Sequence, residues 1–490
     1  APRRRLVRQL VTESLLYTLM AGVVGVAVGF AMLRLLLRLL PLGRPGLPEP
    51  AIDGNVLLFT LVISVFVGIG VGVVPALRAT SYQPWRQLKD SSARSGTSPR
   101  STRLRNVLVV AQIAISVALL IGSGLLIRTM ANLTTVDLGF SPERLLGGAV
   151  EIQEAKYPSA AERAAFYATV LERVRALPGV ISASTVSKFP IASTTTDWPI
   201  WRSDQVRPPG GGRTALSRWA SPAYFETMGM PLLRGRDIAV TDTPDSQRVI
   251  VISEHLAEGI FGEEDSIGQT VKIGWTDDIY EVIGVVGNAR IEGVRSNVTW
   301  AMYTSAAQME TTFQWIAVRT ERDPLLLEDA IRNILDDLDP EVLFSQVTTM
   351  EAAVDGNLSG FRTVMLSLGL LAGVALLLTS VGLYGVLAYN VSQRANEFGV
   401  RLALGAPAAK MLSLVLNKGV QLVVAGLALG IVGSLIGTRL VEQLLYETDR
   451  LDPFSFVGAA AFLAGVALIA CIIPAWRAIR ISPVEVLRRE

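Results

Sequence analysis

Few side chains in this sequence are of the types that perform chemistry. His255 is the single histidine among 490 residues, and Cys471 is the single cysteine. One histidine on a predicted surface helix and one cysteine inside an apolar run do not assemble a Ser/His/Asp or Cys/His nucleophile. Glu258 lies three residues after His255, and two such ligands are too few for a metal site. The acidic run GEEDSIG at 262–268 lacks the alternating ligand spacing of a calcium loop and predicts a solvated turn. We therefore predict no catalytic residue and no metal ligand.

Loops that cradle phosphate are not found either. The run RPPGGGR at 207–213 has no predicted strand before it and no Lys-Ser or Lys-Thr pair after it. No G-x-x-x-x-G-K-[ST] motif occurs in the chain, so it has no Walker A loop for ATP. We expect no cofactor in this chain itself. Trp198, Trp201 and Trp219 would suit a ligand cleft or a domain core, and we favour the core.

The elements that would position any site are mostly membrane helices. Hydrophobic residues make up 50% of the chain and the mean hydropathy is +0.42, which is too apolar for an ordinary soluble protein. A helix needs about 20 apolar residues to cross a bilayer. The first apolar run is too long for a cleaved signal peptide. Six runs qualify as spans: 14–40, 55–77, 106–128, 361–390, 412–441 and 454–476.

Charge is distributed unevenly along the chain. Residues 131–360 carry 19 Lys and Arg against 32 Asp and Glu, whereas the rest carries 26 against 11. Cytoplasmic loops retain Lys and Arg, and basic residues gather at both termini and in the linker 78–105. The pattern predicts cytoplasmic termini and an extracytoplasmic 131–360. Membrane anchoring explains the basic residues, so we expect the lipid bilayer as their partner and no nucleic acid. The span centres carry no charge, which argues against an ion-coupled transporter.

One part of the chain is repeated. PALRATSYQPWRQLKD at 75–90 and PAWRAIRISPVEVLRR at 474–489 match at an offset of 399. Upstream of these, Gly25 matches Gly430 at an offset of 405. We interpret 1–90 as the last two transmembrane helices of a preceding repeat, followed by a basic cytoplasmic linker at 91–105. The alternative is that a helical hairpin was duplicated alone.

The polar insert at 131–360 alternates helix and strand patterns. Amphipathic helices are predicted in AERAAFYATVLERVRALPGV and DPLLLEDAIRNILDDLDP, and both end at proline. Their predicted inner faces are Phe166, Val170, Val174 and Leu177, and Leu327, Ile331, Ile334 and Leu338. Short β-branched runs predict strands at 180–186, 248–253, 270–273, 280–289 and 313–320. The sequence thus predicts an α-helical integral membrane protein with six transmembrane helices and one large α+β extracytoplasmic domain.

The loop VSQRANEFGVRLALGAPAAKML at 391–412 follows the fourth span on the predicted cytoplasmic side. It predicts a short amphipathic helix that carries Phe398 and Leu402 on one side and charged residues on the other, and Gly405 is placed to end it. Such a helix can anchor to lipid or dock into a partner protein. One acid between two arginines is a weak lipid-binding pattern, so docking is favoured.

The segment RANEFGVRLALGA at 394–406 resembles the coupling-helix motif of the FtsX/MacB-like ABC transporter permeases. PAWRAIRISPVEVLRRE resembles the terminal segment of that family, and SPAYFETMGMPLLRGRDI at 221–238 resembles part of its external domain. The resemblance implies a transmembrane helix at 106–130, a MacB-like domain at 131–360, and an FtsX-like three-helix domain at 361–490 with its coupling segment at 391–410. It implies that the coupling segment contacts an ATP-binding subunit through Arg394, Glu397, Phe398, Gly399, Arg401, Gly405 and Ala406.

The resemblance also implies a function. The chain would be a permease subunit in a bacterial inner membrane, with ATP and Mg²⁺ bound by the partner subunit and no enzyme activity of its own. It would drive export or extrusion of a hydrophobic compound, a peptide or a lipoprotein. The alternative is a non-transporting regulator that switches an envelope enzyme such as a cell-wall hydrolase. An envelope adaptor, and a homodimer or a pseudo-dimer with a missing repeat, are further expected partners, because the chain resembles an N-terminally truncated member of the duplicated branch.

Overall fold

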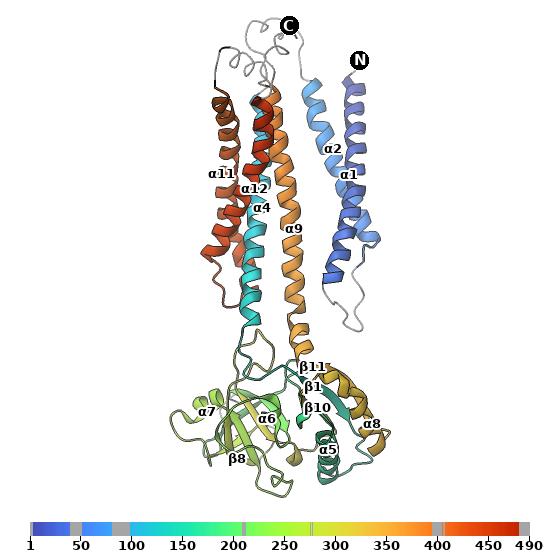
Figure 1. Cartoon of the computed structure of the whole chain (residues 1–490), viewed down its shortest axis with the longest axis vertical. Coiled ribbons are helices and arrows are strands. Elements are labelled where there is room, and N and C mark those ends of the chain that lie inside the picture. The colour runs from blue at the N-terminus through green and yellow to red at the C-terminus, as the bar shows by residue number, and fades with distance from the viewer. Residues whose placement is uncertain are drawn as a thin grey trace. The chain divides into compact units, whose positions relative to one another are not determined.

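The computed structural model describes residues 3–39, 51–80, 99–207, 212–274, 276, 278–393, 404 and 407–479. The chain divides into two compact units. One comprises Ala1–Asn132 and Phe361–Glu490 and is called the membrane unit here. The other comprises Leu133–Gly360 and is called the external unit (Figure 1).

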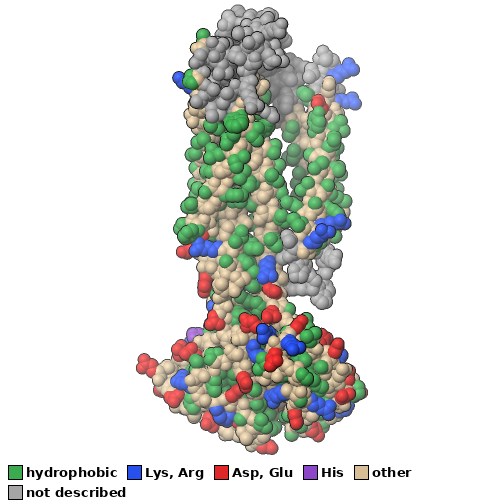
Figure 2. Space-filling view, in the orientation of Figure 1, with side chains coloured by type: hydrophobic (Ala, Val, Ile, Leu, Met, Phe, Trp, Pro, Cys, Tyr) green, Lys and Arg blue, Asp and Glu red, His purple; other side chains and the backbone are tan. Residues whose placement is uncertain are grey.

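The membrane unit is helical. Within the described residues, six helices are long and apolar enough to cross a bilayer. In Figure 2 their surfaces show mainly hydrophobic side chains, with charged side chains toward the helix ends. The prediction of six transmembrane helices joined to a large α+β domain is confirmed. The helices are α1 (Arg3–Leu39), α2 (Gly54–Thr80), α4 (Pro99–Thr134), α9 (Met350–Gln393), α11 (Ala408–Val441) and α12 (Pro453–Ile479).

Helix α9 begins earlier than the apolar pattern suggests. It starts at Met350 and has 44 residues, whereas the apolar run starts at 361. Residues 350–360, MEAAVDGNLSG, are too polar to register as a span but contain no proline. The Thr349 hydroxyl starts the helix by accepting a hydrogen bond from the Ala352 backbone N–H at 3.1 Å. The same helix therefore belongs to both units.

Helices α4, α9, α11 and α12 share one apolar core. Ile113, Val117, Leu383 and Leu463 are among its buried members. Between α4 and α9, the hydroxyls of Ser116 and Thr379 share a buried hydrogen bond of 2.8 Å. A Cβ added at Gly430 of α11 would lie 2.8 Å from Val117 Cβ and 2.9 Å from the Ala114 carbonyl oxygen. Small residues thus let the backbones of α4 and α11 approach closely.

One repeat offset recurs in the element bounds. Helix α2 begins at Gly54 and α12 begins at Pro453, a difference of 399. Asp53 and Asp452 precede α2 and α12, and each carboxylate accepts the backbone N–H of the residue three positions on, at 3.0 and 2.9 Å.

The close contacts within the two hairpins also correspond. In the first hairpin, a Cβ at Gly72 of α2 would lie 3.2 Å from Ser14 Cβ of α1. In the second, a Cβ at Gly419 of α11 would lie 2.8 Å from Cys471 Sγ of α12. Ser14 corresponds to Gly419 and Gly72 to Cys471 at the repeat offsets. Each hairpin therefore places one glycine against one small side chain, but on opposite helices.

The external unit is built on an eleven-stranded sheet over its described residues. Strands β11, β1, β10 and β2 form an antiparallel open sheet. Strands β4, β3, β7, β8, β6 and β9 close into a ring through the parallel β4–β9 pair. The strands are β1 (Leu145–Glu151), β2 (Val180–Val186), β3 (Asp197–Arg202), β4 (Thr214–Ala220), β5 (Leu232–Gly235), β6 (Val249–Ser253), β7 (Thr270–Ile273), β8 (Ile279–Val286), β9 (Ala301–Ser305), β10 (Phe313–Thr320) and β11 (Leu343–Thr349).

Two helices cover one face of the open sheet (Figure 1). Helix α5 (Ala160–Arg175) starts with a capping box in which Ser159 and Glu162 satisfy each other's backbone N–H groups. It buries Phe166, Val170 and Val174, as the sequence predicts. Helix α8 (Glu328–Leu338) buries Ile331 and also Leu335, a position that the predicted face omits.

The ring has its own core. Ile200, Val271, Ile273 and Val282 are buried there with Leu256 of α7 (Glu254–Phe261). A short helix, α6 (Tyr224–Met228), packs on the other side of the open sheet, against β2 and β10. The only pairing between the ring and the open sheet in the described residues is Val186 with Ala220. The ring and the open sheet thus form two halves joined through β2 and β4.

Candidate functional site

The predicted coupling positions fall where the structure gives no description. Arg394, Glu397, Phe398, Gly399, Arg401, Gly405 and Ala406 all lie outside the described residues. Helix α9 ends at Gln393, directly before them, and α11 begins at Ala408, directly after them. The assignment of these seven residues to a docking surface stays a prediction.

The described residues hold a different candidate, a cavity in the external unit. Its volume is about 500 Å³. One wall is the side of α5 that carries Ala161, Ala164, Ala165 and Ala168. Residues 239–245 and 305–311 of the ring half stand opposite it, and Thr185 of β2 and Gln314 of β10 line the cavity from the open sheet. Alanine on this side of α5 leaves room that longer polar side chains would fill.

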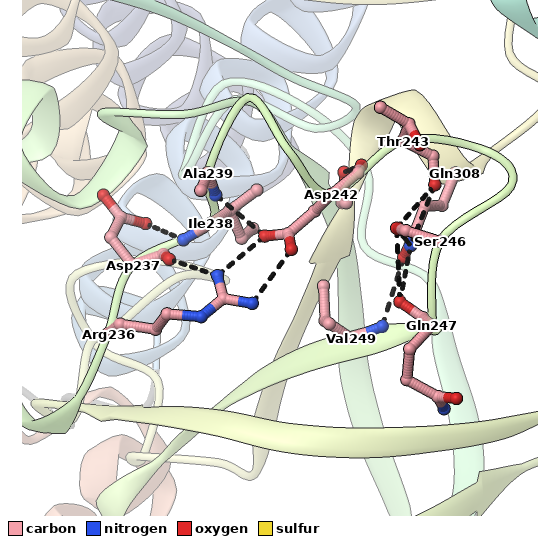
Figure 3. Close-up of polar contacts among 11 residues, drawn as sticks. Arg236, Asp237, Ile238, Ala239, Asp242, Thr243, Ser246, Gln247, Val249 and Gln308 are labelled. Carbon is pink, nitrogen blue, oxygen red and sulfur yellow. Dashed lines mark hydrogen bonds and ion pairs between the residues drawn. The ribbon is translucent and has the colours of Figure 1, made fainter.

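Residues 236–248 join β5 to β6 and are called the braced loop here. The Arg236 guanidinium donates to both carboxylate oxygens of Asp242, at 2.8 and 2.9 Å. Asp242 also accepts the Ala239 backbone N–H at 2.8 Å (Figure 3). Burial alone would raise the pKa of Asp242, but the hydrogen bonds from Arg236 and Ala239 outweigh it and hold the pKa below its ordinary value. The bidentate pair fixes the turn that carries Val240.

Gln308 holds the far end of the braced loop. Its Oε1 accepts the Val249 backbone N–H at 3.1 Å. Its Nε2 donates to the Thr243 carbonyl, the Ser246 hydroxyl and the Gln247 carbonyl at 3.2, 3.1 and 2.9 Å (Figure 3). Gln308 is only 4% exposed. One buried carboxamide therefore fastens the loop wall to the start of β6.

Most polar groups of the cavity already have partners. The Ser305 hydroxyl donates to the Asp242 carbonyl at 3.0 Å, and the Thr311 hydroxyl donates to the Phe313 carbonyl at 2.8 Å. The Tyr167 hydroxyl donates to the Thr312 carbonyl at 3.1 Å, and burial raises the pKa of Tyr167, so it stays neutral. Gln314 differs from them, because it lines the cavity, is 3% exposed, and its Oε1 has no hydrogen-bond partner.

The charged groups of the cavity are held by the protein or lie in the open. Arg163 is buried and donates to the carbonyls of Tyr157 and Pro158 at 2.7 and 3.1 Å. Arg175 is exposed and donates to the Ala183 carbonyl. Asp245 is exposed on the braced loop. The lining therefore presents no cluster of like charge.

The residues that the sequence singles out for chemistry lie elsewhere. His255 is exposed on α7, and its backbone N–H donates to Asn288 Oδ1 at 2.8 Å. The run at 262–268 forms turns and is mostly exposed. Within the described part of the chain, no three His, Cys, Asp or Glu side chains are grouped to hold a metal ion.

The three tryptophans belong mainly to the ring. Trp201 is buried, and Trp198 packs against the core of the ring. Trp198 and Trp219 also line a smaller hollow of about 260 Å³ with Phe313. The favoured interpretation, a domain core, therefore holds for Trp198 and Trp201.

The outer loop of the second hairpin is tied to α4. Arg128 of α4 makes an ion pair with Asp452, the residue that precedes α12. Next to it, the Thr129 hydroxyl donates to the Thr448 hydroxyl at 3.1 Å, and Asn132 Nδ2 donates to the Glu447 carbonyl at 2.9 Å. Because Asp452 is buried and also starts α12, a single carboxylate joins the helix start to α4.

Comparison with known proteins places the chain. The MacB-like periplasmic core domain matches residues 107–334, and the FtsX-like permease C-terminal domain matches residues 1–84 and 369–483. The chain belongs to the FtsX/MacB-like ABC permease family. This permease carries two stretches that match the FtsX-like domain, and the first covers α1 and α2.

Individual proteins are similar to parts of this chain. The permease is 28% identical over 279 residues to a pyoverdine export ATP-binding/permease protein of Pseudomonas syringae, covering 55% of this chain and 41% of the relative. It is 24% identical over 391 residues to the uncharacterized ABC transporter permease YknZ of Bacillus subtilis, covering 75% of this chain and 94% of that protein. The chain thus spans about two fifths of the ATP-binding/permease relative. The solved periplasmic region of MacB from Actinobacillus actinomycetemcomitans aligns to 45% of this chain and 95% of that region at a TM-score of 0.30 and 14% identity.

Proposed function

We propose that this chain is the permease subunit of an ABC transporter that passes ATP-driven motion to the external unit. The observation that carries the proposal is the order of its parts. A span and external domain that match the MacB-like family precede three spans that match the FtsX-like family. In this proposal ATP and Mg²⁺ are bound by an ATP-binding subunit, and the present sequence, which contains no Walker A motif, supplies the permease part.

Helix α9 is the proposed path of the motion. It runs without interruption from Met350 in the external unit to Gln393, and the segment 394–406 follows it at once. An α-helix transmits displacement along its axis because each backbone N–H is bonded to the turn before it. Closure of the ATP-binding subunit on ATP would push the coupling residues, and the external unit would change between two states. The coupling residues are Arg394, Glu397, Phe398, Gly399, Arg401, Gly405 and Ala406.

We propose export of a hydrophobic compound rather than regulation of an envelope enzyme. The cavity in the external unit supports this choice, because its volume of about 500 Å³ lies in the range of small-molecule sites. The relative from Pseudomonas syringae is named as a pyoverdine export protein, which favours export over regulation. Peptide or lipoprotein cargo, an envelope adaptor and a pseudo-dimer with a preceding repeat remain part of the wider proposal.

Co-purification tests the coupling role. The chain is expressed with the ATP-binding subunit encoded next to it, as wild type and as the double variant Glu397→Ala/Arg401→Ala. The matched control is Glu442→Ala/Arg450→Ala, which removes the same two charges from an ion pair of 3.6 Å beyond the other end of α11. We expect the wild type and the control to retain the ATPase after detergent extraction and the coupling variant to lose it. Failure of the wild type to retain any ATPase would contradict the proposal.

We propose that the chain lies in the inner membrane of a bacterium, with both termini in the cytoplasm. Val240 is 84% exposed on the external unit and offers a reporter position. In a Cys471→Ser background, we expect Val240→Cys to react with a membrane-impermeant maleimide added outside intact inner-membrane spheroplasts. Labelling only after lysis would reverse the orientation.

A further inference from the structure

The cavity of the external unit has the construction of a binding site for a small molecule. Its apolar wall is the alanine side of α5, where Ala161, Ala165 and Ala168 are exposed although they stand opposite other protein segments. Its opposite wall is fixed by the Arg236–Asp242 pair and by Gln308. A rigid wall matters, because a loop free to collapse would fill the space that a ligand needs.

One buried group in the cavity lacks a partner. Gln314 is 3% exposed and lines the cavity, and its Oε1 accepts no hydrogen bond. Burying an amide oxygen without a donor is costly. The neighbouring hydroxyls of Ser305 and Thr311 already donate to backbone carbonyls. A ligand with one N–H or O–H group would satisfy the Gln314 carboxamide.

We propose that this cavity binds a neutral, mostly apolar small molecule that carries a hydrogen-bond donor for Gln314. A charged ligand is disfavoured, because Arg163 is held by backbone carbonyls and the lining offers no cluster of opposite charge to replace lost hydration. A folded peptide or lipoprotein is too large for about 500 Å³. The inference rests on the proposed function only in treating this molecule as cargo.

A matched set of fluorescent probes tests the ligand class on the full chain in nanodiscs. N-phenyl-1-naphthylamine is neutral, apolar and has one N–H. Its sulfonated analogue, anilinonaphthalene sulfonate, keeps the rings and the N–H and adds a negative charge. Phenylnaphthalene keeps the rings and has no donor. We expect the amine to bind more tightly than both other probes. Its affinity should exceed that of phenylnaphthalene about tenfold, because only the amine can donate a hydrogen bond to the buried Gln314 carboxamide. Equal binding of the sulfonate would overturn the assignment of a neutral ligand.

Three variants assign that binding to the cavity. Ala168→Trp fills the space beside α5 and is expected to abolish the saturable binding of the amine. Thr169→Trp, the exposed neighbour that does not line the cavity, is the control and should bind as the wild type does. Unchanged binding of the amine by Ala168→Trp would refute the site, because the probe would then be binding to the lipid or to the transmembrane helices.

Gln314→Leu keeps the proposal falsifiable if Ala168→Trp does not fold. It is expected to weaken the amine about tenfold while leaving phenylnaphthalene unchanged, so that the two probes bind alike. An equal loss for both probes would show a purely structural role for Gln314 and overturn its place in recognition. None of these binding measurements uses the ATPase. A failed co-purification test therefore does not affect the ligand assignment, and failed probe binding does not affect the proposed coupling role.

Discussion

Replacement of Gln308 by methionine should release the braced loop. Methionine keeps a similar length and volume but lacks the carboxamide. The change leaves the Val249 backbone N–H without its acceptor, and Val249 is 3% exposed. An unsatisfied buried N–H costs about 1–3 kcal/mol. The other three hydrogen bonds of Gln308 end on Thr243, Ser246 and Gln247, where water can replace the lost donor, so together they add about 1 kcal/mol.

The substitution therefore lowers the free energy of opening the loop by about 2–4 kcal/mol. The population of the open loop should rise about 30-fold to 1000-fold. Amide hydrogen exchange of the full chain measures this directly. We expect faster exchange at the Val249 N–H and across 239–247, with α5 unchanged around Val170. The control is Gln247→Ala, because that side chain is exposed and makes only long contacts of 3.3 and 3.4 Å.

Two results would refute the reasoning. Unchanged exchange at Val249 in Gln308→Met would show that the carboxamide does not hold the loop. Equal acceleration in Gln247→Ala would show that the loop responds to any substitution. A variant that loosens the loop should also weaken the binding of the neutral amine probe, since the loop is a wall of the cavity.

Three further predictions concern packing, pH and the outer end of the membrane unit. Gly430→Leu should lower the melting temperature in detergent, because overpacking against Val117 costs about 1–3 kcal/mol, while Gly25→Leu, its repeat counterpart with nothing within 4 Å, should not; equal effects would contradict the close α4–α11 contact. The lowered pKa of Asp242 means that its carboxylate stabilises the external unit above its ordinary pKa of 3.8 and that this contribution is lost as the pH falls below that value. The Asp242→Asn variant should therefore be less stable than the wild type at neutral pH. Its stability should fall less steeply between pH 5 and 3 (roughly the titration range of a carboxylate), and parallel curves of stability against pH for the two proteins would exclude Asp242 as the titrating group. Asp452→Ala should destabilise the membrane unit by about 1–2 kcal/mol through loss of the α12 start, and more than Ser455→Ala, as measured by thermal aggregation; the reverse order would assign the capping energy to Ser455 alone.

Local patterns predicted much of the external unit. The runs at 180–186, 270–273 and 313–320 are strands with those bounds, because β-branched residues at period two suit a buried sheet. Strand β1, LLGGAVE, was missed because two glycines resemble a turn. In the structure, side chains at Gly147 and Gly148 would collide with the rings of Phe189 and Phe344. Those glycines are required by aromatic rings about 40 and 200 residues away in the sequence, and no local pattern reveals such contacts.

The cavity was beyond sequence reasoning for a similar reason. The inner face of α5 follows from helical periodicity, but its alanine side gains meaning only when 239–245 and 305–311 stand opposite it. The Arg236–Asp242 pair lies in an irregular segment and Gln308 ends a three-residue 3-10 helix, so neither belongs to a segment long enough to show a period. Strand β3, DWPIWR, was missed because Pro199 argues against a strand interior. Fold class could thus be predicted from composition and period, whereas the site depended on contacts between distant segments.

The mirrored glycine contacts of the two hairpins have a consequence for how the halves of this chain can be recombined. Pairing α1 with α12 would set Ser14 against Cys471, two side chains in a space that each natural hairpin fills with one. Pairing α2 with α11 would set Gly72 against Gly419 and leave that space empty. The duplicated hairpins have therefore diverged by compensating changes, and their single helices are no longer interchangeable parts. A chimera should work only when both helices of a hairpin are exchanged together.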